Sequence, residues 1–545
     1  MNSTEAERRG LRHECLLVLV AATAISLLSF AYCFEHHLLL LYGDAVAHLH
    51  IARRVFDSMN PGFRQLGSVW LPLPHLLLIP FVQRMDWWQN GVAGALPSMA
   101  CYIASCVGIY RLARLWLAPR VSLLSLAAFA LNPGLLYLQS TAMTEPLFLA
   151  EMIGTALLVA EFCLEVDRDE TRRANRLLMA AGLVLIAAVY TRYDGWIYAS
   201  FAWLVVAIAL WRSRKLRGPL MGSFLLFTVM LAAAPALWLA YNARQFGDAL
   251  DFMRGPYSAR AIELRTATPG APHYPGWHSM PVASLHFLKA AELGAVAIAW
   301  GNQLLWLTVA GTLLALYECR SRAIGAAVLL WIPLPFYAYS IAYGSVPIFI
   351  PVWWPFSYYN TRYGMEMLPA FALFGAFAVG WLLNRAQASY PRVSRWLFAA
   401  AILLIAGNTV VLLRAKPIVL QEAIANSRTR IPFEGAFSDA LRALPQEGLI
   451  LMYTSEHVGA LQKAGIALRR TINETDYYHF KPALEVPAES ARWVVATEGD
   501  VVDKAVKLHP NELELVSVTC STGQPCARIY RSQVDNPVAP TSRIR

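Results

Sequence analysis

The sequence predicts an all-α polytopic membrane domain followed by a small α/β domain, and three observations carry this prediction. Hydrophobic residues make up 57% of the 545 residues and charged residues only 15%, whereas soluble domains are about half apolar and about a quarter charged. Eleven apolar runs approach the length of about 20 residues that crosses a bilayer. From residue 415 onward, these runs give way to short segments typical of alternating strands and helices.

The eleven predicted spans begin close to the amino terminus and continue to residue 414. They lie near 15–34, 92–117, 121–139, 146–164, 177–191, 195–211, 219–241, 290–317, 323–342, 363–383 and 396–414. The first run has basic residues ahead of it, but it is long for a signal peptide and lacks a small-x-small cleavage site, so we expect it to remain as the first helix. We therefore divide the chain into a membrane domain, 1–414, and an α/β domain, 415–545.

The basic residues indicate the orientation of this domain. The net charge of +10 comes from short clusters between apolar runs, a pattern that the positive-inside rule explains without a nucleic-acid partner. With the amino terminus in the cytoplasm, every cluster falls on the cytoplasmic side: Arg111, Arg114 and Arg120; Arg168, Arg172, Arg173 and Arg176; Arg212, Arg214, Lys215 and Arg217; Arg320 and Arg322; Arg385, Arg392 and Arg395. We expect a multi-pass protein of a prokaryotic plasma (inner) membrane with its α/β domain outside the cytoplasm.

The first outside loop, residues 35–91, is long and patterned. Gly43-Asp44 opens an amphipathic stretch, and an apolar segment over 70–81 follows. This segment is too short to span and contains three prolines, so we expect a re-entrant or interfacial helix. The next two outside loops, 140–145 and 191–195, are tight turns that each carry an acidic residue.

In the α/β domain, the segments 449–453, 493–496 and 513–518 have the apolar patterns of strands. Cys520 and Cys526 flank a turn that contains Gly and Pro, between two predicted strands. Because the topology places them in an oxidising compartment, we expect a disulfide between them.

Two acids are the candidate catalytic residues. Asp44 faces the aqueous mouth of the membrane domain and could deprotonate an acceptor hydroxyl; the alternative is a helix N-cap. Glu145 lies in a minimal turn between two spans, where a carboxylate indicates function; the alternative is a cap ahead of Pro146. Asp44 and Glu145 are also the candidate ligands of a divalent metal ion, and no other cofactor is indicated.

A leaving phosphate needs a fixed positive charge, and Arg362, followed by Tyr363 in an aromatic outside loop, can supply it. The alternative is an arginine that snorkels to the membrane surface. Arg192 and Asp194 are further candidates for substrate binding, although they could form only an ion pair within their turn.

Two histidines complete the candidate site. His48 follows Asp44 by four residues and would share its helix face, and His75 lies in the proline-rich apolar segment. Either could hold a metal or a sugar hydroxyl, and polar interface histidines are the alternative.

The order of these motifs resembles a known family. Gly43-Asp44, the Pro72-Leu73-Pro74 segment, Met143-Thr144-Glu145-Pro146-Leu147-Phe148, and Arg362-Tyr363 with Leu368-Pro369-Ala370 look like the GT-C glycosyltransferases over residues 15–415. Within that superfamily, the chain is similar to the branch of protein O-mannosyltransferases and aminoarabinose transferases.

The resemblance implies inverting transfer of one sugar, a hexosyl or pentosyl group such as mannosyl, from a polyprenyl-phosphate lipid to a hydroxyl acceptor on a glycan, lipid or protein. It places Asp44 at the family's catalytic acid, Glu145 at its second-loop acid and Arg362 at the lipid phosphate. Trp353-Trp354-Pro355 differs from the Trp-Trp-Asp-Tyr-Gly signature of oligosaccharyltransferases, which disfavours block transfer of a glycan to Asn.

Two other functions fit a polytopic protein. A transporter or flippase would place ionisable residues at the membrane centre and show two similar halves, whereas the acids here cluster at one membrane face and no repeated half is visible. A non-catalytic assembly factor would leave the Asp44 loop unexplained.

Overall fold

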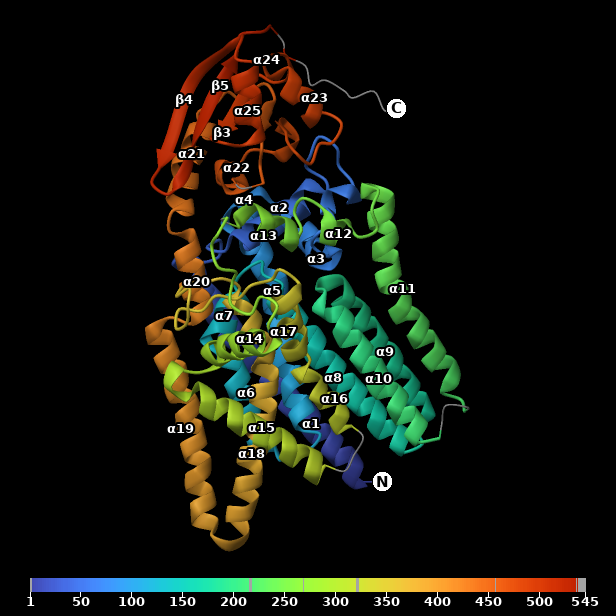
Figure 1. Cartoon of the computed structure of the whole chain (residues 1–545). Coiled ribbons are helices and arrows are strands. Elements are labelled where there is room, and N and C mark those ends of the chain that lie inside the picture. Colours follow the sequence, from blue (N-terminus) through green and yellow to red (C-terminus); the bar gives the residue numbers. More distant parts are fainter. Residues whose placement is uncertain are drawn as a thin grey trace. The chain divides into compact units, whose positions relative to one another are not determined.

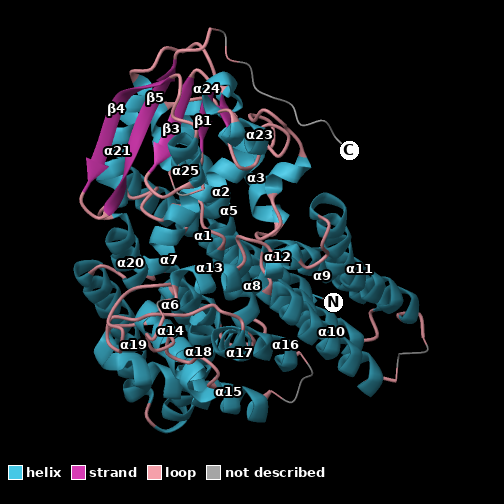
Figure 2. Ribbon diagram, turned by 45° about the horizontal axis from the view of Figure 1, so that its top comes forward, coloured by secondary structure: helices cyan, strands magenta, loops and turns pink. Residues whose placement is uncertain are grey.

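The computed structural model describes residues 2–214, 218–267, 269–319, 323–455, 457–535 and 537. Four basic residues of the predicted cytoplasmic clusters, Lys215, Arg217, Arg320 and Arg322, lie outside these ranges. The described chain is mainly helical (Figures 1 and 2). It divides into two compact units. Unit 1 comprises 1–36, 68–74 and 96–422, and unit 2 comprises 37–67, 75–95 and 423–545. The first outside loop thus belongs mostly to the same unit as the α/β domain.

Unit 1 holds the long apolar helices. In chain order, its helices are α1 (Asn2–Glu35), α5 (Val92–Ala113), α6 (Pro119–Ala130), α7 (Pro133–Leu138), α8 (Glu145–Asp167), α9 (Thr171–Thr191), α10 (Asp194–Arg212), α11 (Met221–Phe246), α12 (Asp251–Arg254), α13 (Ala259–Thr266), α14 (Met280–Ala295), α15 (Gly301–Glu318), α16 (Ile324–Val328), α17 (Pro333–Tyr343), α18 (Leu368–Ser389), α19 (Pro391–Ala415) and α20 (Ile418–Ser427). The first turn of α5 and the last residues of α20 belong to unit 2. Three short 3₁₀ segments, η2 (Ile298–Trp300), η3 (Leu329–Trp331) and η4 (Thr361–Met367), join them.

Ten helical stretches of the described chain are long and apolar enough to cross a membrane, one fewer than predicted. The predicted span 121–139 is divided between α6 and α7. The break has a local cause, because Pro133 lacks a backbone N–H and Asn132 starts a new helix by accepting a 3.1 Å hydrogen bond from Leu135 N. Hydropathy alone does not register such a break inside a continuous apolar run.

The predicted span 290–317 also needs correction, since the membrane-length helix there covers Ile298–Glu318 and α14 is separate. Two asparagines satisfy the backbone groups exposed at this break. Asn408 accepts from Ala297 N at 3.0 Å and donates to Ala295 O at 3.1 Å, while Asn132 donates to Gly294 O at 2.9 Å. Because these partners are distant in sequence, the local pattern could not reveal the break.

Unit 2 contains a five-stranded sheet with the strand order β2-β1-β3-β5-β4. Figure 2 labels four of these strands, β1, β3, β5 and β4. The strands are β1 (Ile450–Met452), β2 (Thr471–Ile472), β3 (Trp493–Thr497), β4 (Leu513–Ser521) and β5 (Gln524–Ser532). The pairs of β1 with β2 and with β3 are parallel, and β5 is antiparallel to both of its neighbours. The three predicted strand segments are therefore confirmed as β1, β3 and β4.

The helical segments of unit 2 come from both ends of the chain. They are α2 (Gly43–Arg54), η1 (Phe63–Leu66), α3 (Pro72–Val82), which begins in unit 1, α4 (Met85–Asn90), α21 (Arg430–Arg442), α22 (Val458–Ala464), η5 (Leu468–Arg470), α23 (Phe480–Glu485), α24 (Pro487–Ser490) and α25 (Val501–Leu508). The short apolar helix expected over 70–81 is α3. The turn between β4 and β5 is closed by a disulfide between Cys520 and Cys526.

Specific hydrogen bonds hold the first loop to the α/β domain inside unit 2. Arg430 Nη2 donates to the carbonyls of Leu40 and Leu41 at 2.8 and 3.1 Å. Gln462 Nε2 donates to the Trp88 carbonyl, and α2 packs against α22. The segment that carries Asp44 is therefore framed by residues of the carboxy-terminal half.

Candidate active site

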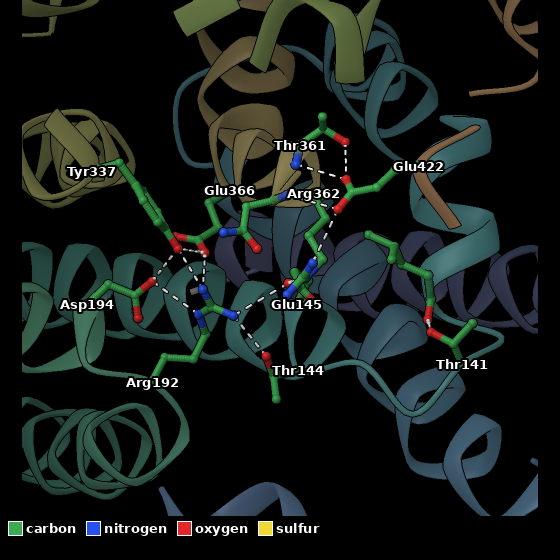
Figure 3. A network of polar contacts seen from close by, with 12 residues as sticks. Thr141, Thr144, Glu145, Arg192, Asp194, Tyr337, Thr361, Arg362, Glu366 and Glu422 are labelled. Atoms are coloured by element: carbon green, nitrogen blue, oxygen red, sulfur yellow. Dashed lines mark hydrogen bonds and ion pairs between the residues drawn. The ribbon is translucent and has the colours of Figure 1, made fainter. Parts of the chain in front are cut away.

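A buried network of arginines and carboxylates lies in unit 1, where the turns that precede α8 and α10 meet η4 (Figure 3). Glu145, Glu366 and Glu422 are fully buried, with exposed fractions of 0%, and Asp194 is 3% exposed. Buried charges are retained only where they are paired, so each carboxylate should face a cation or a hydrogen-bond donor.

Glu145, the first residue of α8, links the two arginines. Its Oε1 accepts from Arg362 Nε at 3.1 Å and lies 3.5 Å from Arg192 Nη1. Thr144, not Glu145, occupies the N-cap position of α8. The second oxygen of Glu145, Oε2, is buried without a hydrogen-bond partner in the described part of the chain.

Arg192 connects the turn before α10 with α8, α17 and η4. Its Nε donates to Asp194 Oδ2 at 3.1 Å, so the predicted ion pair is present. Nη1 donates to Thr144 Oγ1 at 2.8 Å. Nη2 donates to the Tyr337 hydroxyl at 2.6 Å and lies 3.3 Å from Glu366 Oε1. A planar guanidinium with five N–H donors suits this divergent set of oxygens.

The Tyr337 hydroxyl joins the acids on the other side of Arg192. It lies 3.0 Å from Asp194 Oδ2 and 2.7 Å from Glu366 Oε1. The Tyr337 ring stacks on Tyr363, with centroids 5.1 Å apart. The guanidinium carbons of Arg192 and Arg362 both lie 4.9 Å from the centre of the Tyr363 ring. The Tyr363 ring therefore contacts both cations, an arrangement that favours positive charge.

Arg362 lies in η4 and is buried, with an exposed fraction of 7%, rather than extended toward a surface. Glu422 of α20 lies 3.5 Å from its Nη1, opposite the contact of Nε with Glu145. Gly364 lets this segment approach α14, because a Cβ there would lie 2.5 Å from Ala291 N. The arginine is thus fixed by its segment and by two carboxylates.

Asp44 lies in unit 2, in the first turn of α2 and partly exposed. Tyr42, not Asp44, occupies the N-cap position of α2. One turn later, His48 Nδ1 is 2.9 Å from His75 Nε2, and both rings are buried. Burial and the neighbouring Arg54 and Arg53 hold the pKa of His50 on the same helix well below its ordinary value, so that residue is neutral near pH 7.

The structure brings five of the predicted site residues together in unit 1, namely Glu145, Arg192, Asp194, Arg362 and Tyr363. It places Asp44, His48 and His75 in unit 2. Within the described residues, no group of three or more His, Cys, Asp or Glu side chains is arranged to hold a metal ion.

Three members of the network, Tyr337, Glu366 and Glu422, were not predicted from the sequence. Glu366 carried a usable signal, because a carboxylate inside a predicted span indicates a functional or paired site. Glu422 was assigned to the α/β domain by its position after residue 415, yet it contacts η4 in unit 1. Tyr337 had no local signal, since it lies in an apolar, aromatic run.

The fold of the chain is similar to that of solved structures. No model of a protein family and no curated protein matches the sequence. Among solved structures, ArnT from Cupriavidus metallidurans bound to undecaprenyl phosphate aligns with a TM-score of 0.57 at 13% identity, covering 96% of this chain and 99% of that chain. Its apo state aligns with a TM-score of 0.53 at the same identity and coverage. An oligosaccharyltransferase from Archaeoglobus fulgidus aligns with a TM-score of 0.46 at 13% identity, over 89% of this chain and 69% of that chain. The chain therefore has the overall fold of ArnT, a GT-C fold.

Proposed function

We propose that this protein is a membrane glycosyltransferase that moves one sugar from a polyprenyl-phosphate donor to a hydroxyl acceptor, with inversion at the sugar C1. The observation that carries the proposal is the alignment over 96% of the chain with an ArnT structure that holds undecaprenyl phosphate. A fold alone does not determine an activity, so the site must supply the remaining support.

The buried arginines of the network in unit 1 support the proposal. Arg362 and Arg192 are fixed cations in a low-dielectric interior, where a phosphate is bound more strongly than in water. Glu145 and Glu366 each present a buried oxygen without a hydrogen-bond partner among the described residues, and such oxygens can accept from sugar hydroxyls. Of the two arginines, Arg362 is the proposed ligand of the donor phosphate.

Asp44 is the proposed general base. Its carboxylate takes the proton of the acceptor hydroxyl while the acceptor oxygen forms a bond to C1 of the sugar. The bond from C1 to the phosphate oxygen breaks at the same time, and polyprenyl phosphate leaves with the electron pair. The proposed setting is a prokaryotic plasma membrane, with this chemistry on its extracytoplasmic face. The proposed sugar is a hexose or pentose, and mannose is the first to test.

Transfer by the purified full chain from undecaprenyl-phosphate sugars tests this proposal, with Asp44→Asn as the decisive variant. General-base catalysis typically contributes about 10²–10⁴-fold, and an amide cannot accept the proton, so turnover should fall by that factor while donor binding persists. Asp86→Asn is the matched control, because Asp86 is in the same unit and forms an exposed ion pair with Arg84. Wild-type turnover in Asp44→Asn would remove Asp44 from the chemistry. Failure of the wild type with every sugar donor would overturn the function.

Glu145→Gln is the necessary companion variant. If Asp44 and Glu145 serve the same step through a shared proton or metal, the double variant should be no slower than the slower single variant. Multiplied losses would show that the two acids act independently.

A further inference from the structure

We propose that Glu422 is a positioning residue that orients Arg362 toward the lipid phosphate. The proposal rests on the proposed function, since it assumes that Arg362 is a phosphate ligand. It is carried by the contacts of a single buried carboxylate with three consecutive residues, 360–362. Figure 3 shows Glu422 beside two of them, Thr361 and Arg362.

Glu422 serves as the cap of η4 from a distant part of the chain. Its Oε1 accepts from Asn360 N at 2.8 Å, and its Oε2 accepts from Thr361 N at 2.9 Å. Oε2 also accepts from the Thr361 hydroxyl. The side chain of Asn360, the N-cap residue, is used elsewhere, because its amide donates to the Pro347 carbonyl at 3.1 Å. The N–H groups that open a helical turn need acceptors, and here a carboxylate supplies both.

The same carboxylate contacts the guanidinium that follows. Oε1 lies 3.5 Å from Arg362 Nη1, while Glu145 holds Nε at 3.1 Å. Backbone and guanidinium are therefore fixed by one fully buried group. Asn360 has a φ of 56°, a left-handed conformation in which non-glycine residues are uncommon. The two N–H bonds to Glu422 lock this turn, which sets the direction in which the Arg362 side chain leaves the backbone.

Glutamine at this position cannot reproduce the contacts, although it has nearly the same size. In either orientation, the amide NH₂ would face a backbone N–H: that of Asn360, beside the Arg362 guanidinium, or that of Thr361. A backbone N–H cannot accept a hydrogen bond, so one of the two capping bonds is lost. Glu422→Gln should therefore leave the chain folded while it misaligns η4. The expected result is an increase of about 10-fold in both the Kd for undecaprenyl phosphate and the donor KM, with kcat within about threefold, because phosphate is bound before and during the reaction.

Three further variants make the experiment decisive. Glu165→Gln is the matched control, because Glu165 is an equally buried carboxylate of unit 1, 3% exposed, but pairs with Arg168 and Arg173 at the other end of α8. It should leave the lipid Kd unchanged. Arg362→Ala should weaken lipid binding at least as much as Glu422→Gln, and the double variant should be no weaker than Arg362→Ala alone, because one residue acts through the other.

Several outcomes would overturn the inference. An unchanged lipid Kd in Glu422→Gln, or effects that multiply in the double variant, would show that Glu422 does not act through Arg362. A fall in kcat alone would also contradict a role in binding. The function itself fails in a different way: if Arg362→Ala binds undecaprenyl phosphate as the wild type does and Asp44→Asn keeps turnover, the assigned chemistry is wrong whatever Glu422 does.

Discussion

Replacement of Arg192 by lysine should destabilise unit 1 although it preserves the charge. The guanidinium contacts oxygens of Thr144, Asp194, Tyr337 and Glu366 at 2.6–3.3 Å in several directions. A single ammonium on a flexible stem cannot reach all of them, so at least two charge-assisted hydrogen bonds are lost. Each is worth about 1.5–3 kcal/mol, and we expect a loss of about 3 kcal/mol or more in the free energy of unfolding.

Unfolding kinetics in detergent provide the assay, because unfolding of a large membrane protein is measured more safely as a rate. Cys106 and Cys163 are buried thiols outside the disulfide, so a thiol-reactive dye reports their exposure on unfolding. If half of the lost free energy lowers the unfolding barrier, the rate rises about 10-fold. Arg168→Lys is the control, since the Arg168 side chain is 61% exposed and its partner, Glu165, has a second ion pair with Arg173. Equal unfolding rates of Arg192→Lys and the wild type would refute this account of the network.

Three other predictions concern unit 2. Replacement of Cys520 and Cys526 by serine opens the β4–β5 turn and should cost about 2 kcal/mol for a loop of this size; thermal unfolding should show it, with Cys319→Ser unchanged. Arg430→Ala removes the donor to two carbonyls just ahead of α2, so turnover should fall about 10-fold while lipid binding persists, and a loss of binding would contradict this. Burial raises the pKa of Asp476 to about 6, so its protonated form is favoured on folding. That contribution is fully present below the ordinary pKa near 3.8 and is lost as pH rises through about 6. The midpoint temperature of unfolding should therefore fall less between pH 4 and pH 7 in Asp476→Asn than in the wild type. An equal fall in both proteins would exclude Asp476 as the source of the pH dependence.

Sequence patterns predicted the helices and strands that depend mainly on residues close together in the chain. Apolar runs located the spans, and the alternation and turn residues of the α/β domain located β1, β3 and β4. The acid in each tight turn was recognised because Glu145 and Asp194 interrupt apolar surroundings where a charge needs a reason. What these residues contact was not readable, apart from the nearby pair of Arg192 with Asp194.

Long-range pairing accounts for the remainder. Glu145 and Arg362 are 217 positions apart, and Tyr337 and Asp194 are 143 apart. No periodicity relates such positions, because their meeting depends on how whole helices pack. The two-residue strand β2 was missed for a related reason, since Thr471 and Ile472 become a strand only by pairing with β1.

Unit 2 combines segments from the two ends of the chain, and this has a consequence for biosynthesis. The segment with Asp44 leaves the ribosome early, but the residues that frame the first loop, Arg430 and Gln462, lie 390 and 374 positions after their partners Leu40 and Trp88. At synthesis rates of about 5–20 residues per second, that delay is roughly 20–80 s. During this interval the first loop lacks its final hydrogen-bond partners. A chain truncated before Arg430 should therefore keep the first loop sensitive to protease, however well its helices insert.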